Sequence, residues 1–447
     1  MVGRDEQLKS LNEYYNSDKN NLTILYGRHR IGKTELIRNF IRDKKCIYFN
    51  AVPMDGPRMR AAFAECAGCG TGAGQDYAML FGKIIRNNSG RILIVVEEFQ
   101  NIVKVDSSFM GAVAALMHGS FSDAKVMVIL TSPSVAWVEN SMVKTIGQAA
   151  FSINYFMKLK ELSYADVVGM YPESDADTTL CIYALTGGIP GYVSEWDASG
   201  SVKSNVCRLL LNKGGAFRKE AENFIRDEFR ETGVYNVILG CLAFGMNKLN
   251  EIHEFTGYGR DKISVYLGNL IEREIAEKVF SYDAGGKKNT RKGLYRIKDD
   301  FTDFWYRFVY PHACILDVAE PGEFYDKYIA GGISDFVREA FIKVALEFLE
   351  IMNEMGRLKA DCSYRGRWYG KKGDIHIIYG NAGYNIIAQV YTGPESVTKK
   401  AYDELLNSAE LAAVKPDQIY MFSEGGFSPE LMELSGEKLI LITISEL

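Results

Sequence analysis

Eight consecutive residues carry the clearest chemical pattern in this chain, Gly27-Arg28-His29-Arg30-Ile31-Gly32-Lys33-Thr34. Their spacing fits the phosphate-binding loop GxxxxGK[ST], whose two glycines let backbone N–H groups point at phosphate oxygens. In such a loop Lys33 reaches the β- and γ-phosphates, and the Thr34 hydroxyl ligates Mg²⁺. The pattern therefore predicts that all eight residues bind ATP or GTP together with Mg²⁺.

Two carboxylates, Glu97 and Glu98, follow the aliphatic run at 92–96. Such a run is typical of a strand that is covered on both faces in a parallel sheet, and ligands bind beyond the carboxyl ends of such strands. We predict that Glu97 is a Mg²⁺ ligand and that Glu98 is the catalytic base for water. Aspartate is commoner at the first position, so hydrolysis is expected to be slow. The alternative is a strand that ends in a solvated acidic turn.

The elements around these residues form a β–α–β alternation. Apolar runs predict strands at 21–26, 45–50, 91–96 and 125–130, and apolar spacing predicts a helix at 33–42. Thr131 and Ser134 follow the last of these strands and either sense the γ-phosphate or form a plain turn. The glycine-rich segment 66–74, with Cys66 and Cys69, is interpreted as a loop because no second ligand pair for zinc accompanies it.

The middle of the chain is predicted to be helical at 160–230 and to continue as a winged helix-turn-helix. Helices are expected at 235–245, 248–256 and 260–274, and a hairpin at 275–297. The hairpin tip carries the DNA-binding candidates Lys287, Lys288, Arg291 and Lys292. These cations would contact DNA phosphates, and an ordinary solvated basic loop is an equally weighted alternative.

The last 120 residues are predicted to form a further α/β unit. We expect helices at 334–355 and 397–411, a tight turn at 364–370, and strands at 374–379, 384–390, 418–422 and 438–444.

Composition limits the classes of protein that the chain can be. Its 447 residues, 47% of them hydrophobic, suffice for several cores, and 52 basic against 57 acidic residues give a net charge of −5. That balance excludes a uniformly basic nucleic-acid coat but not a local basic patch. No apolar run approaches the roughly 18 residues of a membrane span, and residues 1–6 lack a signal-peptide pattern. The eight scattered cysteines indicate reduced thiols, so a cytoplasmic, multidomain protein without a membrane partner is expected.

Several further segments, taken in order, resemble the prokaryotic P-loop ATPases that are often called archaeal-type ATPases, which are related to the AAA+ and signal-transduction ATPase lineages. Besides the phosphate loop and Glu97-Glu98, the segments that carry the resemblance are Val2-Gly3-Arg4, Leu185-Thr-Gly-Gly-Ile-Pro190, Phe304-Trp-Tyr-Arg-Phe308, Gly366-Arg-Trp-Tyr369 and Phe422-Ser-Glu-Gly-Gly-Phe427. The resemblance implies ATP as the nucleotide and a C-terminal domain similar to restriction endonucleases.

The chain also departs from that family. The family usually has Asp-Glu at 97–98 and Gly-Arg where this chain has Gly147-Gln148, which removes a charge-stabilising arginine. The nuclease-like pattern has an acid in its first strand and Glu-x-Lys in its second, and at these positions this chain has His376, then Gln389 and Tyr391, with Asp374 nearby. We therefore predict that the C-terminal domain does not cleave DNA and serves as a binding or dimerisation platform. DNA cleavage dependent on Mg²⁺ or Mn²⁺ and abolished by Asp374→Ala would contradict this prediction.

Taken together, the sequence predicts an α/β protein built on a P-loop NTPase parallel sheet. The expected domains are an ATPase core at 1–159, a helical lid at 160–231, a winged helix at 232–312 and a restriction-endonuclease-like domain at 325–447. The leading hypothesis is an ATP-dependent switch that acts on DNA or a protein partner. The alternatives are an active ATP-driven DNA-processing enzyme and a DNA-binding regulator in which ATP is only structural; a homo-oligomer stays open.

Overall fold

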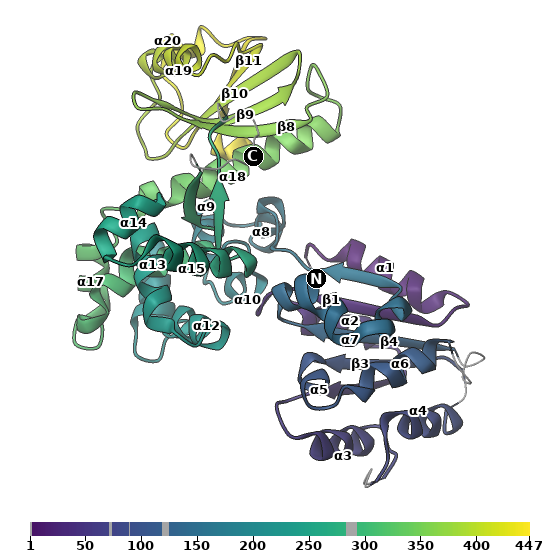
Figure 1. The fold of residues 1–447 in the computed structure, drawn as a ribbon. Coiled ribbons are helices and arrows are strands. Elements are labelled where there is room, and N and C mark those ends of the chain that lie inside the picture. Colours follow the sequence, from purple (N-terminus) through teal and green to yellow (C-terminus); the bar gives the residue numbers. More distant parts are fainter. Residues whose placement is uncertain (1, 71–73, 89, 119–124, 283–292) are drawn as a thin grey trace. The chain divides into compact units, whose positions relative to one another are not determined.

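The chain folds into two compact units. A computed structural model describes residues 2–70, 74–88, 90–118, 125–282 and 293–447 (Figure 1). The N-terminal unit runs to Glu161 and also contains Ile189–Gly191, and the C-terminal unit contains Leu162–Gly188 and Tyr192–Leu447. Within these described ranges, no helix combines the length and the apolar character that crossing a membrane requires.

A five-stranded, wholly parallel sheet is the centre of the N-terminal unit. Its spatial order is β2-β3-β4-β1-β5. The strands are β1 (Asn21–Tyr26), β2 (Cys46–Asn50), β3 (Ile92–Glu97), β4 (Val126–Ser132) and β5 (Tyr155–Lys158). The four strands predicted from apolar runs are confirmed, and the short edge strand β5 was not predicted.

Helices cover both faces of this sheet because its strands are buried on both sides. Leu22 and Ile24 of β1 pack with the helices of one face, and Leu25, which follows Ile24, packs with those of the other. On the side of Leu25 lie α1 (Asp5–Asn16) and α2 (Lys33–Ile41). On the opposite side lie α3 (Gly56–Cys66), α4 (Tyr77–Arg86), α5 (Gln100–Val105) and α6 (Ser108–His118). The layers are those of an α/β protein, as predicted.

The first part of the C-terminal unit is helical, as expected from the sequence. Its helices are α8 (Tyr164–Met170), α9 (Ala176–Thr186), α11 (Val202–Val206), α12 (Glu220–Glu228), α13 (Thr232–Ala243), α14 (Leu249–Thr256) and α15 (Arg260–Glu272). The short helix α10 (Pro190–Val193) begins in the segment that belongs to the N-terminal unit. After α15, β6 (Ala276–Val279) and β7 (Leu294–Ile297) form a two-stranded antiparallel sheet. The predicted DNA-binding residues Lys287, Lys288, Arg291 and Lys292 lie outside the described residues.

A mixed five-stranded sheet, in the order β12-β11-β10-β9-β8, ends the chain. The elements from α16 onward are α16 (Asp300–Phe304), α17 (Pro321–Tyr328), α18 (Ile333–Glu354), β8 (Tyr364–Tyr369), β9 (Asp374–Asn381), β10 (Tyr384–Tyr391), α19 (Lys399–Leu411), β11 (Gln418–Ser423), α20 (Pro429–Met432) and β12 (Leu439–Thr443). Neighbouring residues of β11 show that α18 and α19 cover opposite faces, because Phe422 contacts Phe341 of α18 while Met421 packs with α19.

The tight turn predicted at 364–370 is wrong. This segment is strand β8, which pairs with β9 and has an irregularity between Gly366 and Trp368. Trp368 is buried in the core of the sheet, and a Cβ on Gly366 would lie 3.3 Å from the Tyr282 ring. The glycine therefore allows close packing inside a strand rather than a reversal of the chain.

Candidate functional site

The phosphate loop connects β1 to α2 at the carboxyl edge of the parallel sheet. Its two glycines have positive φ angles, 153° at Gly27 and 93° at Gly32. A Cβ on Gly27 would lie only 2.7 Å from the backbone oxygen of Leu159. The loop therefore needs glycine at this position for close packing against the chain that follows β5.

Lys33 lies at the first position of α2 and folds back over the loop. Its Nζ donates to the backbone oxygens of Gly27, at 2.6 Å, and Arg28, at 2.8 Å. Burial lowers the pKa of Lys33 to about 8, against the opposing effect of Glu97 and Glu98. The three side chains thus lie close enough to interact electrostatically, as the sequence predicts for a phosphate and metal site.

Thr34 and Glu97, the two predicted Mg²⁺ ligands, meet directly. The Thr34 hydroxyl donates to Glu97 Oε2 at 3.1 Å, although 62 residues separate the two in the chain. Glu97 is 8% exposed, and its Oε1 has no hydrogen-bond partner among the described residues. A buried carboxylate oxygen without a donor fits a cation, and hydroxyl and carboxylate oxygens are ligands that Mg²⁺ prefers. These residues therefore suit the ion.

Glu98, the predicted catalytic base, has a left-handed backbone with φ 54°. Its Oε2 accepts a hydrogen bond from Asn101 Nδ2 at 3.1 Å, and Asn101 also donates to the backbone oxygen of Ala51 at 2.8 Å. The Glu98 N–H lies 3.4 Å from Thr131 Oγ1. Non-glycine residues of this conformation concentrate at functional sites, where surrounding contacts hold them.

The remaining loop residues have different surroundings. Arg28 forms a 3.9 Å ion pair with Glu161, His29 is exposed, and Ile31 is buried beneath the loop. Arg30 has a left-handed backbone with φ 62°. At these positions the loop pattern assigns phosphate binding to the backbone N–H groups, so the side chains can make other contacts.

Arg4 supports the loop, although its residue type and position in the sequence predicted no role for it. It is 5% exposed, and its Nη2 donates to the backbone oxygens of Ile31, at 3.1 Å, and Lys160, at 2.7 Å. Arg4 thereby connects the beginning of the chain, the phosphate loop and the chain after β5. The only signal for it in the sequence was Val2-Gly3-Arg4 as part of the family resemblance.

A short segment from outside the first 161 residues also contacts the loop. The N–H of Gly191 donates to the Arg30 backbone oxygen at 2.9 Å. A Cβ on Gly191 would lie 2.7 Å from the Cβ of Arg30, and one on Gly32 would lie 3.9 Å from Pro190. Ile189–Gly191 thus belongs to the N-terminal unit, while the chain on either side of it belongs to the C-terminal unit.

In the C-terminal sheet, the residues at the predicted nuclease positions form a hydrogen-bonded group. Val390 N–H donates to His376 Nδ1 at 3.1 Å, so a neutral His376 carries its proton on Nε2, which lies 3.2 Å from Asp374 Oδ2. Gln389 Nε2 lies 3.3 Å from the other oxygen of Asp374. Burial lowers the pKa of His376 despite Asp374. The Tyr391 hydroxyl instead lies 3.4 Å from the backbone oxygen of Ala401.

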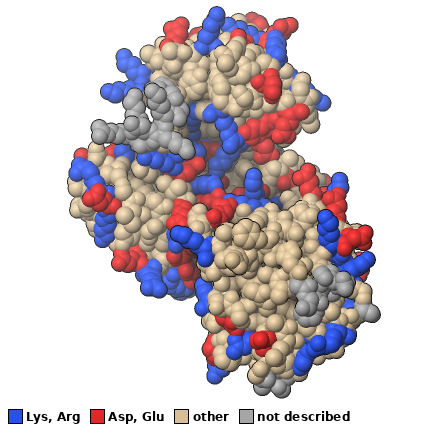
Figure 2. Space-filling view, turned by 45° about the vertical axis from the view of Figure 1, so that its right-hand side comes forward, with Lys and Arg blue, Asp and Glu red and all other residues tan. Residues whose placement is uncertain are grey.

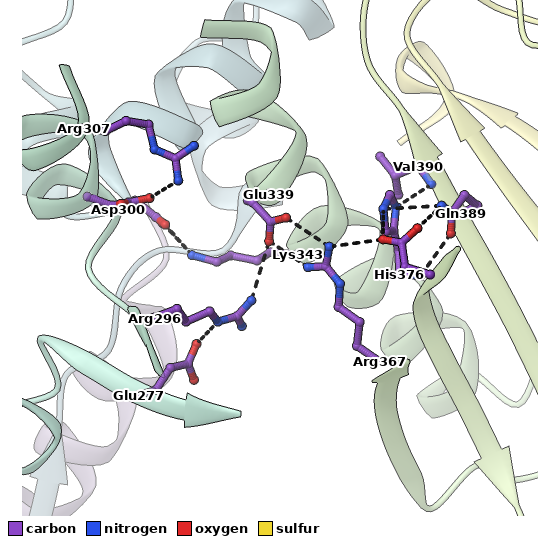
Figure 3. Close-up of polar contacts among 12 residues, drawn as sticks. Glu277, Arg296, Asp300, Arg307, Glu339, Lys343, Arg367, His376, Gln389 and Val390 are labelled. Atoms are coloured by element: carbon purple, nitrogen blue, oxygen red, sulfur yellow. Dashed lines mark hydrogen bonds and ion pairs between the residues drawn. The ribbon is translucent and has the colours of Figure 1, made fainter. Parts of the chain in front are cut away.

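This group does not fit a hydrolytic metal centre. Within the described residues, no three His, Cys, Asp or Glu side chains are arranged to hold a metal ion. Arg367 Nη2 lies 3.9 Å from Asp374 Oδ2, and its guanidinium forms hydrogen bonds of 2.8 and 3.1 Å with Glu339 (Figure 3). The carboxylates that a cation would need are therefore neutralised by an arginine.

The chain is similar in sequence to several known proteins. Residues 305–389 match a family described as archaeal and bacterial proteins of unknown function. An uncharacterized protein of Methanocaldococcus jannaschii is 27% identical over 383 residues, which cover 85% of this chain and 84% of the relative. An uncharacterized ATP-binding protein of the same organism is 52% identical over 45 residues, which are 10% of this chain and 76% of that protein.

The Walker-type ATPase paby2304 of Pyrococcus abyssi has a similar solved structure. The match has a TM-score of 0.51 and 15% identity, and it covers 69% of this chain and 96% of that protein. At this identity the likeness concerns the fold, which agrees with the parallel sheet and the loop geometry. The fold and the sequence match to the short M. jannaschii relative lead to one conclusion: the chain belongs to the archaeal P-loop ATPase family.

Proposed function

We propose that this protein binds ATP with Mg²⁺ in its N-terminal unit and acts as a nucleotide-dependent switch. The loop N–H groups and Lys33 hold the phosphates, and Thr34 and Glu97 hold the metal ion. Bound Mg²⁺ supplies neutralisation of phosphate charge. The contact between Thr34 and the buried, partly unpartnered Glu97 carries this proposal, because it joins the two residue types that a Mg–nucleotide site requires.

The switch is proposed to work through Ile189–Gly191. The Arg30 backbone oxygen accepts from Gly191, so a movement of the phosphate loop on nucleotide binding strains or releases this contact. The segment is continuous with α9 and α10, and the rest of the C-terminal unit follows it in the chain. We propose that the segment has two arrangements and that the nucleotide-bound loop favours one of them. Such a difference in affinity is what a ligand needs to shift the population of two conformations.

Nucleotide titration with matched variants tests the binding site. We expect Lys33→Ala to reduce ATP affinity by at least about 100-fold, because a charge-assisted contact to phosphate is lost in a buried site. Lys9→Ala is the control, since Lys9 is an exposed lysine of the same unit. Equal ATP affinity of wild type and Lys33→Ala would refute the proposal.

Hydrogen exchange tests the switch. We expect ATP to slow amide exchange at residues 27–34 and 189–191 and to change exchange elsewhere in the C-terminal unit. Gly191→Val should abolish the distant change, because its side chain collides with Arg30, and an ATP titration shows whether the collision also alters binding at 27–34. Protection confined to the N-terminal unit in the wild type would contradict a switch.

ATP turnover is a second candidate function, favoured by the position of Glu98. Its carboxylate acts on the pKa of Lys33 and is anchored by Asn101, so it lies at the phosphate edge of the sheet. Steady-state turnover that DNA stimulates and that Glu98→Gln abolishes would establish the enzyme. The absence of turnover, with binding intact, favours the switch.

DNA is the partner that we propose for the C-terminal unit. The order of α13, α14, α15 and the β6–β7 pair supports a winged helix-turn-helix. Acidic and basic side chains are intermixed on the face shown in Figure 2, so affinity would depend on a local cluster rather than on a broad basic surface. Replacing Lys287, Lys288, Arg291 and Lys292 with glutamine should weaken salt-dependent DNA binding. If DNA binding is unchanged, these four residues do not form the DNA-binding site.

A further inference from the structure

A cavity of ≈ 810 Å³ lies within the C-terminal unit. Residues from the segment of β6, from β7, from α18 and from β8 and β9 line it. Its volume is within the range of roughly 300–1,000 Å³ that small-ligand sites occupy. The cavity is separate from the phosphate loop, which belongs to the other unit.

Aromatic rings form much of the wall. Phe280, Tyr282, Tyr364 and Tyr369 all line the cavity. Tyr282 and Tyr364 are paired at a centroid distance of 5.9 Å and an interplanar angle of 35°. Tyr369 is fixed because its N–H donates to Ser281 Oγ at 3.2 Å. These ordered aromatic faces suit a flat ring such as a nucleobase.

The charged lining is predominantly basic. Five basic side chains among the described residues line the cavity, against the carboxylate of Glu339. They are Lys278, Arg296, Lys343, Arg365 and Arg367. Glu339 is already engaged, because it accepts two hydrogen bonds from Arg367 and lies 3.6 Å from Arg296 (Figure 3). The ionic groups facing the cavity therefore favour an anion.

Two of these cations have capacity for a further partner. The Nζ of Lys278 lies 4.8 Å from the centre of the Tyr295 ring, and Lys278 has no ion pair with a carboxylate in the described part of the chain. The Nε of Arg367 is buried and has no hydrogen-bond partner among the described residues. An unsatisfied buried donor is costly, and an acceptor supplied by a ligand removes that cost.

The other basic side chains are held by carboxylates. Lys343 bonds to both oxygens of Asp300, at 2.6 and 2.7 Å, and Arg296 bonds to Glu277 at 2.6 Å. These pairs fix the wall of the cavity across several elements before any ligand arrives. A preformed wall reduces the ordering that binding requires.

We propose that this cavity is a second binding site and that its ligand is a nucleoside phosphate, with the base against Tyr282 and Tyr364 and the phosphate toward Lys278 and Arg367. The ligand is either a free mononucleotide or the phosphorylated end of a nucleic-acid strand, which share this chemistry. The site does not depend on the triphosphate or on Mg²⁺. It gives the C-terminal unit a ligand of its own.

Equilibrium dialysis with AMP tests the site in the full-length Lys33→Ala chain, in which the phosphate loop is disabled. We expect saturable AMP binding that Lys278→Gln and Tyr282→Leu each weaken by roughly tenfold, which is the scale of one phosphate or one stacking contact. Lys415→Gln is the matched control, because Lys415 is exposed and does not line the cavity. Its AMP affinity should be unchanged, and circular dichroism verifies that each variant is folded.

Two more probes are a 5′-phosphorylated oligonucleotide and inorganic phosphate. The first tests whether the ligand is a strand end or a free mononucleotide, and the second tests whether the base contributes to binding. If a 5′-phosphorylated oligonucleotide binds with the same sensitivity to Lys278→Gln while AMP does not, the site takes strand ends and the proposal holds. If inorganic phosphate binds as tightly as AMP, the proposed contact of the base with Tyr282 and Tyr364 is wrong. The absence of saturable binding of all three probes at millimolar concentration, or binding that neither Lys278→Gln nor Tyr282→Leu changes, would overturn the site.

Discussion

The nucleotide affinity of this protein should fall steeply between pH 7.5 and 9.5. The cause is Lys33, whose pKa of about 8 in the free protein is well below the ordinary value of 10.5. Burial disfavours its charged form, and the nearby Glu97 and Glu98 restore only part of that charge. Nucleotide phosphates need the protonated lysine, so binding above this pKa must take up a proton.

The magnitude follows from the protonated fraction of Lys33. With a pKa of about 8, that fraction falls from about 0.8 at pH 7.5 to about 0.03 at pH 9.5. ATP affinity is then expected to fall roughly 25-fold, which corresponds to about 2 kcal/mol. A lysine with its ordinary pKa would lose only about a tenth of its charge over the same interval.

Titration of the full-length protein with a fluorescent ATP analogue at fixed ionic strength measures this dependence. Lys33→Arg is the matched control, because a guanidinium stays protonated across the whole interval. Its affinity is expected to be lower at pH 7.5 and nearly constant up to pH 9.5. A flat profile for the wild type, or an equal decline in Lys33→Arg, would refute the assignment of the pH dependence to Lys33.

Four other outcomes are expected from the described contacts. Gly27→Ala should reduce ATP affinity at least about tenfold by calorimetry, because its Cβ would lie 2.7 Å from the Leu159 backbone oxygen; wild-type affinity would show that the loop tolerates a side chain. Glu97→Gln should abolish the gain in ATP affinity that Mg²⁺ gives over EDTA, and a persistent gain would place the ion elsewhere. Arg4→Ala should lower the free energy of unfolding of the N-terminal unit by about 2–4 kcal/mol in urea, since two backbone oxygens lose a charged donor; a loss below about 0.5 kcal/mol would contradict this. Asp303 has its pKa raised to about 7 by burial, against the effect of Arg307, so the native state retains a proton that the unfolded chain loses near pH 4. Stability should therefore fall by up to about 4 kcal/mol as pH rises from about 4 to 7, and Asp303→Asn should flatten this part of the profile in thermal denaturation.

The regular elements could be predicted where burial imposes a simple pattern on the sequence. β1, β3 and β4 are covered on both faces, so they are continuous apolar runs, and the amphipathic α18 differs by one residue at each end from its prediction. The strand β8 escaped prediction because Gly366 among five charged or aromatic residues resembles a turn. Its pairing with β9 and its contact with Tyr282 are tertiary, and tertiary context overrides local propensity.

Only the parts of the candidate site that have a local sequence pattern could be predicted. The phosphate loop is contiguous, and Glu97 follows a recognisable strand, so local spacing sufficed for both. Arg4, by contrast, acts on oxygens that are 27 and 156 residues away, and Gly191 contacts Arg30 across 161 residues. No local pattern encodes such contacts.

The charged cluster of the C-terminal unit bears on the prediction that this domain does not cleave DNA. Asp374 contacts His376 and Gln389, and Glu339 contacts Arg367. Arg367 is within 3.9 Å of both carboxylates. Against the effect of burial, the Arg367 and Arg296 guanidinium groups lower the pKa of Glu339 to about 2, so Glu339 stays ionised at every physiological pH. Removing Glu339 would leave the Arg367 charge without its main partner, so these ion pairs hold the two side chains together. The Nε of the same arginine has no hydrogen-bond partner among the described residues, so this donor is available to an anion in the proposed cavity site.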